Sequence, residues 1–292
     1  MLYWCIEMSR LILLALLILI ISCDQKGEEL PMNPITIKIG ESGEDFLQRN
    51  KLTGSAVVDK QPAGLNFYEY DWPSSALGKV RLDHGSHSFE IPFVLGITGT
   101  EDTALMNEGI TKFQLRAGVT ADDTLPHDEA RRELIKLIDK LVTLGWKRFI
   151  FYQEPRLTAQ DAFKLHLNDD TYGLPLDYDP SLEEWMAIGV GRWYLYAGDI
   201  FLQIEFRRDS KLMAPSQAGA YLLVLNFISA AEHAKSEFTG DDRNRWMDLW
   251  INQIKALKKD RYKKEADLIK RGSTIYTEYA EPKIHPADPV EP

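Results

Sequence analysis

Residues 192–206 read RWYLYAGDIFLQIEF, and this stretch decides the fold class of the chain. Two runs rich in aromatic and β-branched residues flank the pair Gly198-Asp199, which favours a tight reversal of the backbone. The pattern predicts a β-hairpin, whose two strands run antiparallel. We therefore expect an antiparallel sheet in this part of the chain.

The region before the hairpin predicts further strands. Its short aromatic and β-branched runs are separated by clusters of Gly, Pro and Asp, which break strands. The runs are residues 35–39, 65–70, 79–83, 88–95 and 110–117. We divide the chain into a β-rich region, 35–121, and an α+β region, 122–281. Whether they are separate domains stays open, and residues 121–126 are the best candidate boundary.

The α+β region begins with a predicted helix. Thr124 can cap it, Pro126 fits its first turn, and Gly145 can end it. Five apolar residues recur at helical spacing and predict one buried face. They are Leu134, Leu137, Ile138, Leu141 and Leu144. Residues 146–153, WKRFIFYQ, then read as a strand.

Three more elements complete the predicted fold. Ser181 and Glu184 form a capping-box pattern that predicts a short helix over 182–188. Residues 220–228 fit either a strand or the start of a buried helix, because periodicity does not decide between them. A long helix over about 241–271 carries an apolar stripe that includes Trp246 and Trp250, both expected to be buried.

Residues 255–264, on this long helix, form a basic run that we interpret as a solvated face. We expect the Pro-rich segment 282–292 to be disordered. Together the elements predict an α+β fold, with antiparallel sheet and several packed helices.

The N-terminal segment predicts a bacterial lipoprotein. Residues 8–23 read MSRLILLALLILIISC, in which an apolar run of 11 residues ends in a lipobox-like motif and Cys23. This run is too short for a comfortable membrane span. We expect a signal peptide over 1–22, a lipid on Cys23 and a tether over 23–34. Met8 is an alternative start, and Asp24 favours inner-membrane retention if enterobacterial sorting applies, with the outer membrane otherwise.

Composition limits the classes of partner. The net charge of −10 argues against nucleic acid and suits either a basic protein partner or simple solubility. The chain has two cysteines, Cys5 in the leader and Cys23 at the predicted lipid site. The mature domain should therefore form no disulfide, although a periplasmic compartment would permit one.

The sequence contains no clear motif for catalysis or for cofactor binding. The chain has no Gly-x-Ser-x-Gly elbow, no P-loop and no Gly-x-Gly-x-x-Gly, so we expect no cofactor. His84 and His87 with Asp83 could bind zinc, but a hairpin turn with incidental histidines explains the same residues. Paired carboxylates are plentiful, and a periplasmic hydrolase that uses such a pair stays an alternative.

One acidic loop is the best candidate for binding a partner. Residues 168–184 hold six acidic residues and no basic one, with tyrosines that could anchor a partner while the charges steer it. The alternative is an ordinary solvated loop. The candidate contacts are Asp169, Asp170, Tyr172, Asp177, Tyr178 and Asp179.

Several short motifs over residues 134–282 support a resemblance to a known family. They are Gly145-Trp146, Pro155-Arg156-Leu157, Glu184-Trp185, Arg192-Trp193, Arg245-Trp246, Arg261 with Glu265, and Tyr276 through Tyr279 to Pro282. Together they resemble proteobacterial lipoproteins encoded beside type VI secretion effectors, especially lipases.

This resemblance implies an immunity protein, which neutralises a secreted toxin in the periplasm by binding it and has no catalytic residues. The alternatives to this function are the hydrolase and an envelope-structural lipoprotein.

Overall fold

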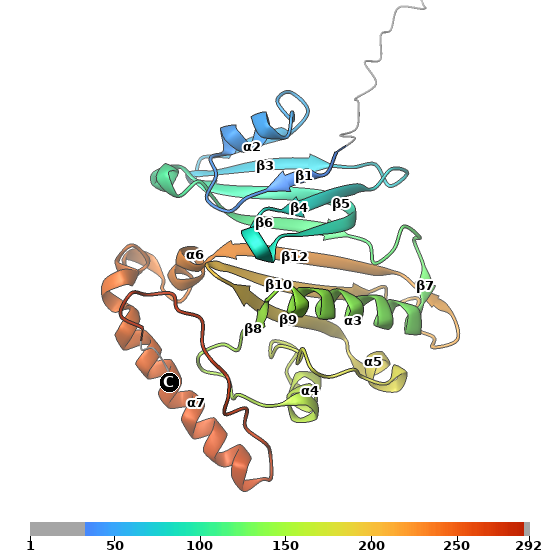
Figure 1. Cartoon of the computed structure of the whole chain (residues 1–292), viewed down its shortest axis with the longest axis vertical. Helices are drawn as coiled ribbons and strands as arrows, with labels where there is room; N and C mark the ends of the chain where they lie inside the picture. Colours follow the sequence, from blue (N-terminus) through green and yellow to red (C-terminus); the bar gives the residue numbers. More distant parts are fainter. Residues whose placement is uncertain (1–32, 289–292) are drawn as a thin grey trace, which may run out of the picture. The chain divides into compact units, whose positions relative to one another are not determined.

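The structure, a computed structural model, describes residues 33–288 (Figure 1). The described residues all belong to one compact unit. The expected signal peptide, Cys23 and nearly all of the tether lie outside the described residues and stay predictions. None of the helices within residues 33–288 is long and apolar enough to span a membrane.

The fold is α+β, as predicted, and is built on a ten-stranded, mostly antiparallel sheet. The strand order is β1-β4-β5-β6-β12-β10-β9-β8, while β3 pairs with β5 and β2 with β3. Among the strands of residues 33–288, β1 and β4 are the only pair that runs parallel. The strands are β1 (Ile35–Ile37), β2 (Val57–Gln61), β3 (Leu65–Asp71), β4 (Gly78–Leu82), β5 (Phe89–Asp102), β6 (Ile110–Ala117), β8 (Lys147–Arg148), β9 (Val190–Ala197), β10 (Ile200–Arg208) and β12 (Tyr221–Ser229).

Two short strands, β7 (Leu125–Pro126) and β11 (Ala218–Gly219), form a separate ladder. The α-helices of the described chain do not form a single layer. They are α2 (Gly43–Arg49), α3 (His127–Thr143), α4 (Ala159–Asn168), α5 (Leu182–Ala187), α6 (Ala230–Lys235) and α7 (Trp246–Lys270).

The predicted hairpin is confirmed as β9 and β10. Ala197 and Ile200 are register partners around the Gly198-Asp199 turn, and Gly198 has the positive φ of 54° that glycine tolerates. Residues 220–228, for which the sequence left strand or helix open, lie in the strand β12 (Tyr221–Ser229) except for Ala220. Because β12 pairs with β6, one sheet runs through both of the regions that we divided at residues 121–126.

The central strands have two faces, which we call front and back. The front face carries Leu202, Leu225 and Phe227, and the main apolar core lies on it. Neighbouring residues on the same strands, such as Phe201 and Asn226, point to the back face because side chains alternate along a strand.

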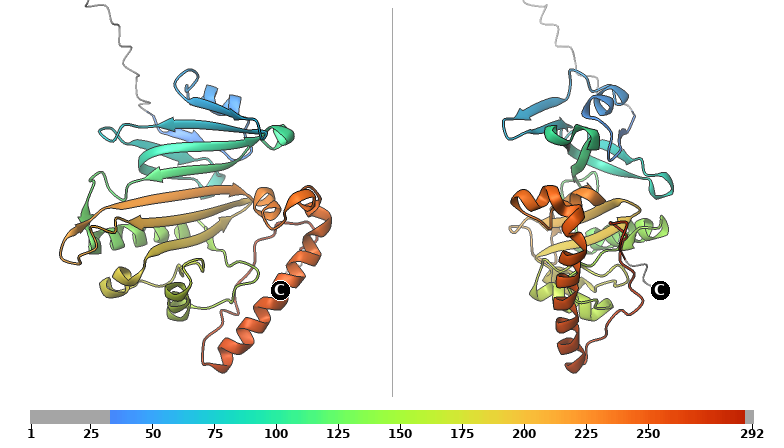
Figure 2. Two further views of the ribbon diagram at one scale, coloured as in Figure 1. Left: turned by 180° about the vertical axis from the view of Figure 1, so that it is seen from behind. Right: turned by 90° about the vertical axis from the view of Figure 1, so that its left-hand side faces the viewer.

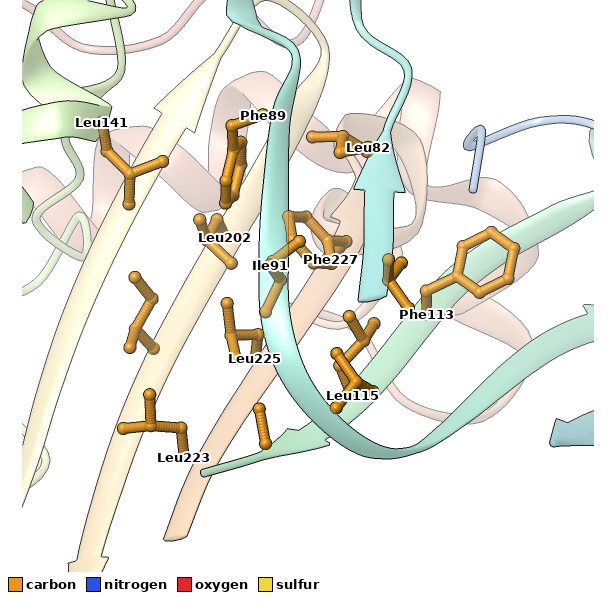
Figure 3. Packing of buried hydrophobic residues seen from close by; sticks show 14 of the residues in the cluster. Leu82, Phe89, Ile91, Phe113, Leu115, Leu141, Leu202, Leu223, Leu225 and Phe227 are labelled. Carbon is orange, nitrogen blue, oxygen red and sulfur yellow. The ribbon is translucent and has the colours of Figure 1, made fainter. Parts of the chain in front are cut away.

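A bend in β5 closes the front face. The register of β5 shifts between Val94 and Gly96, and Phe93 has a φ of 58°. The first half of β5 therefore folds over the front face, where Phe89 and Ile91 approach Leu202 and Phe227 (Figure 3). The rings of Phe89 and Phe227 lie 6.0 Å apart. α3 covers the neighbouring strands of the same face, with Leu134, Ile138 and Leu141 buried (Figure 2).

The start of α3 differs from the prediction. The helix begins at His127, and neither Thr124 nor any other side chain caps it. The reason is the small ladder with β11, which holds Leu125 and Pro126 in an extended conformation. The capping box of Ser181 and Glu184 is present in full and begins α5.

The predicted strand over 146–153 is mostly absent, since β8 holds only Lys147 and Arg148, and Phe149 adds one backbone hydrogen bond of 2.8 Å to the Tyr194 carbonyl on β9. The backbone beyond leaves the sheet because Arg261, on α7, takes its carbonyl groups. The guanidinium donates to the carbonyl oxygens of Phe151 and Glu154 at 2.8 and 2.9 Å.

Three predictions for the C-terminal region were wrong. Trp250 is fully buried but Trp246 is only half-buried, at the helix start. The basic run is not wholly solvated, because Arg261 is 1% exposed and pairs with Glu281. The predicted disorder of 282–292 is wrong for residues 282–288, where Asp288 accepts a hydrogen bond of 2.8 Å from the Trp250 indole, while residues 289–292 lie outside the described residues.

A candidate binding surface on the acidic loop

Tyr172 fastens the acidic loop (residues 168–184) to the core. Its side chain is 2% exposed, and its hydroxyl donates to the Pro155 carbonyl at 2.7 Å. The Arg148 guanidinium lies over the ring, 5.6 Å from its centre. Our expectation that Tyr172 is an exposed contact for a partner was wrong, because this ring fills a small apolar cluster beneath the loop.

Tyr178 is half-buried, and its contacts within the protein stabilise the loop. Its ring lies 5.1 Å from that of Phe163 on α4, and its hydroxyl donates to Glu184 at 2.6 Å. The hydrogen bond to this carboxylate raises the pKa of Tyr178 to about 12. The same bond, with help from Ser181, lowers the pKa of Glu184.

His166 closes the loop from the side of α4. The imidazole is 2% exposed, and its two nitrogens lie 2.6 and 3.0 Å from the carbonyl oxygens of Tyr172 and Val190. Burial lowers the pKa of His166. The ring therefore ties the end of α4 to both the loop and the start of β9.

The four candidate aspartates are all exposed, and neighbouring groups orient three of them. Asp169 accepts from the Thr171 backbone and hydroxyl, which lower its pKa. Asp170 lies 3.0 Å from Arg192, and Asp179 pairs with Arg131. Asp177 is exposed at the middle of the loop. The structure thus brings Asp169 and Asp170 together, while Asp177 and Asp179 stand further along.

Arg192 is itself held by a buried carboxylate. Its Nε donates to Glu205 at 2.7 Å, and Arg207 pairs with the same group. Burial would raise the pKa of Glu205, but the hydrogen bonds from Arg192 and Arg207 outweigh burial and hold the pKa below its usual value. Glu205 therefore stays ionised and keeps Arg192 in place for Asp170.

A cavity of about 520 Å³ opens beside Asp169 and Asp170. It is lined by residues 166–170 and 187–190, and we call it the acidic groove. Leu167 borders it and is 43% exposed. Two carboxylates next to an exposed aliphatic side chain form a site for the charged head and carbon stem of a lysine or arginine.

The histidine pair predicted as a turn forms part of the scaffold. His84 precedes a short 3₁₀ turn between β4 and β5, and His87 is the last residue of that turn. Each imidazole contacts a backbone carbonyl. The partners are Ala197 at 2.8 Å and Leu144 at 2.7 Å. Within residues 33–288, no group of three His, Cys, Asp or Glu side chains is arranged to hold a metal.

Sequence reasoning missed the buried ion pairs behind the loop. Arg156 donates to Glu265 at 2.9 Å, and Arg261 is enclosed with Glu281. Arg261 and Glu265 were recognised only as a motif, since a basic helix run normally indicates a solvated face. Their spacing of four residues, beside aromatic residues, was the available signal.

A scan against protein-family models, a search of curated proteins and a search of solved structures each found no match.

Proposed function

We propose that this protein binds a basic surface of another protein through its acidic loop and acidic groove, and that immunity against a secreted effector is the specific form of this function. The observation that carries the proposal is the fixed presentation of the aspartates. Asp170 and Asp179 are oriented by Arg192 and Arg131, while Asp169 is oriented by Thr171.

A fixed loop is suited to tight binding. A partner that meets a mobile loop must order it, and this ordering reduces affinity. Here the buried side chains of Tyr172 and His166 already hold the backbone. The entropy of ordering the loop is therefore lost on folding and does not reduce the affinity for the partner. The aspartates remain exposed and can steer a basic partner into place.

The acidic groove defines the chemistry of the contact. A lysine or arginine of the partner would place its charge near Asp169 and Asp170 and its carbon stem against Leu167. The net charge of −10 favours the same class of partner at longer range. An inhibitor that works by occupancy needs only this surface and no reacting group.

The compartment is also a proposal, based on the N-terminal sequence. A lipid on Cys23 would hold the protein in the bacterial envelope, facing the periplasm. We expect Cys23→Ser to abolish labelling by a palmitate analogue and to leave an unprocessed precursor, because Cys5 precedes the apolar run. Normal labelling of this variant would contradict the lipid anchor.

A competition experiment tests immunity. Prey cells of the parental strain that lack this gene are mixed with the unmodified parent while its type VI secretion is active. We expect the prey to lose viability, and a periplasmic copy of the wild-type gene to restore it. Equal survival with and without the gene would reject immunity.

Charge variants then test the surface. Asp169→Lys with Asp177→Lys should remove protection, because the pair reverses charge at the groove and at the loop centre. The matched control is Asp122→Lys with Asp123→Lys, which makes the same change of net charge on another exposed turn. If both double variants protect equally, the partner binds elsewhere on the protein.

A further inference from the structure

The back face of the sheet holds a second cavity, of about 320 Å³, away from the acidic groove. Its floor is a row of cross-strand neighbours on β6, β12, β10 and β9. They are Gln114, Asn226, Gln203 and Tyr194. Gln114 donates to Asn226 at 2.9 Å, and the side chains of this row give the floor a polar character.

Aromatic rings form the walls of this cavity. Phe151 packs edge-on against Tyr194 at 4.8 Å, and Phe149 packs edge-on against Phe201 at 4.9 Å. His233, on α6 at the end of β12 (Figure 1), stacks on Phe201 at 4.1 Å. Walls that offer both ring faces and ring edges favour a planar aromatic guest over a flexible aliphatic one.

His233 has an unused hydrogen-bonding atom. The side chain is 7% exposed, and within residues 33–288 its Nε2 is buried with no hydrogen-bond partner. Burial lowers the pKa of His233 to about 4, so the ring is neutral at neutral pH. A buried polar atom without a partner costs stability, and a bound polar group would remove that cost.

Lys112 supplies a positive charge on the same cavity. It belongs to the next row of the back face, beside Ile228, and its side chain is exposed. An ammonium group on the rim of an aromatic pocket favours a ligand with an anionic group that can remain near solvent.

We propose that this cavity binds a small planar aromatic carboxylate that also bears a hydroxyl group. The ring would pack against Phe149, Phe151 and Phe201, the hydroxyl would pair with His233, and the carboxylate would face Lys112. The site is independent of the acidic loop, because none of its lining residues falls within 166–190.

The test uses 6-hydroxy-2-naphthoate as the probe, titrated into the whole folded protein by calorimetry. We expect saturable one-to-one binding, tighter than that of decanoate, which has the same charge but no ring. Absence of binding, or tighter binding of decanoate, would overturn the proposal.

Two variants locate the probe. His233→Phe retains the ring stacking but removes the nitrogen, and should weaken binding roughly tenfold. Lys112→Met should weaken it about threefold, as expected for one exposed charge. Lys255→Met, on an exposed position of α7, is the matched control and should bind like the wild type.

A second readout keeps the test valid if His233→Phe folds poorly. In the wild-type protein, the ring ¹⁵N signals of His233 should shift when the probe binds, while those of His84 should not. Unchanged His233 signals at saturation would place the probe outside the cavity and overturn the proposal.

Discussion

The strand β12 has two unlike sides, and the difference explains how this protein combines stability with binding surfaces. On the front face Leu223, Leu225 and Phe227 are at most 5% exposed, in the main apolar core. On the back face Leu222 and Asn226 are only half-buried. Apolar side chains from other parts of the chain fill the space over the front face. The back face, in contrast, retains a cavity.

The segments that cover the back face are held by buried ion pairs as well as by an apolar cluster around Phe149 and Trp250. Arg261 and Glu281 pair there, and Arg156 pairs with Glu265, on segments that lie far apart in the sequence. Apolar packing tolerates small shifts of its partners, but a buried ion pair needs both members. The two faces should therefore respond differently to substitution, and the predictions below test this difference.

The largest expected effect is on the back. Arg261→Met leaves the carbonyls of Phe151 and Glu154 without their donor and removes one of the two cations that pair with Glu281, the other being Lys258. We therefore expect a loss of about 3–5 kcal/mol in urea melts. Adding Glu281→Gln should recover little of the loss, because Lys258 still pairs with Glu281 in the single variant and would lose this carboxylate in the double variant. A loss below about 1 kcal/mol for the single variant would show that the pair is not essential.

The second prediction compares the loss of stability caused by the same substitution on the two faces of β12. Leu225→Ala, on the front, should cost about 2–5 kcal/mol because the side chain is fully buried. Leu222→Ala makes the same chemical change on the half-buried back face and should cost less than half as much. Equal losses in urea melts would mean that the two faces are equally closed.

The smallest expected effect is on how the free energy of unfolding depends on pH. Because burial lowers the pKa of folded His233 to about 4, the unfolded state binds more protons between about pH 6.5 and 4. The contribution of the neutral His233 to the free energy of unfolding is thus complete above about pH 6.5. It is lost as the pH falls to 4, by roughly 3 kcal/mol. His233→Phe should lack this dependence, so its unfolding free energy should approach or exceed that of the wild type in acid. Parallel pH profiles would contradict the buried, neutral state of His233.

The elements that the sequence predicted well are those with local causes. A Gly-Asp turn between two strand-forming runs specified the β9–β10 hairpin, and a capping box specified the start of α5. β6 was predicted with its observed bounds. The helix α2 and the edge strand β2 were missed because both are short, and every residue of β2 is exposed, so it lacks an alternating pattern.

For the candidate site, the sequence determined the charge of the acidic loop, since six acidic residues without a basic one remain acidic in any fold. Only the tertiary structure decided that Tyr172 is buried beneath that loop, that Arg192 and Arg131 orient its aspartates, and that Arg261 belongs to the interior. The physical reason is that local patterns report turns, caps and amphipathic faces. The partner of a charge or an aromatic ring, in contrast, is set by segments that only folding brings together, as with Arg261 and the carbonyl of Phe151, 110 residues apart.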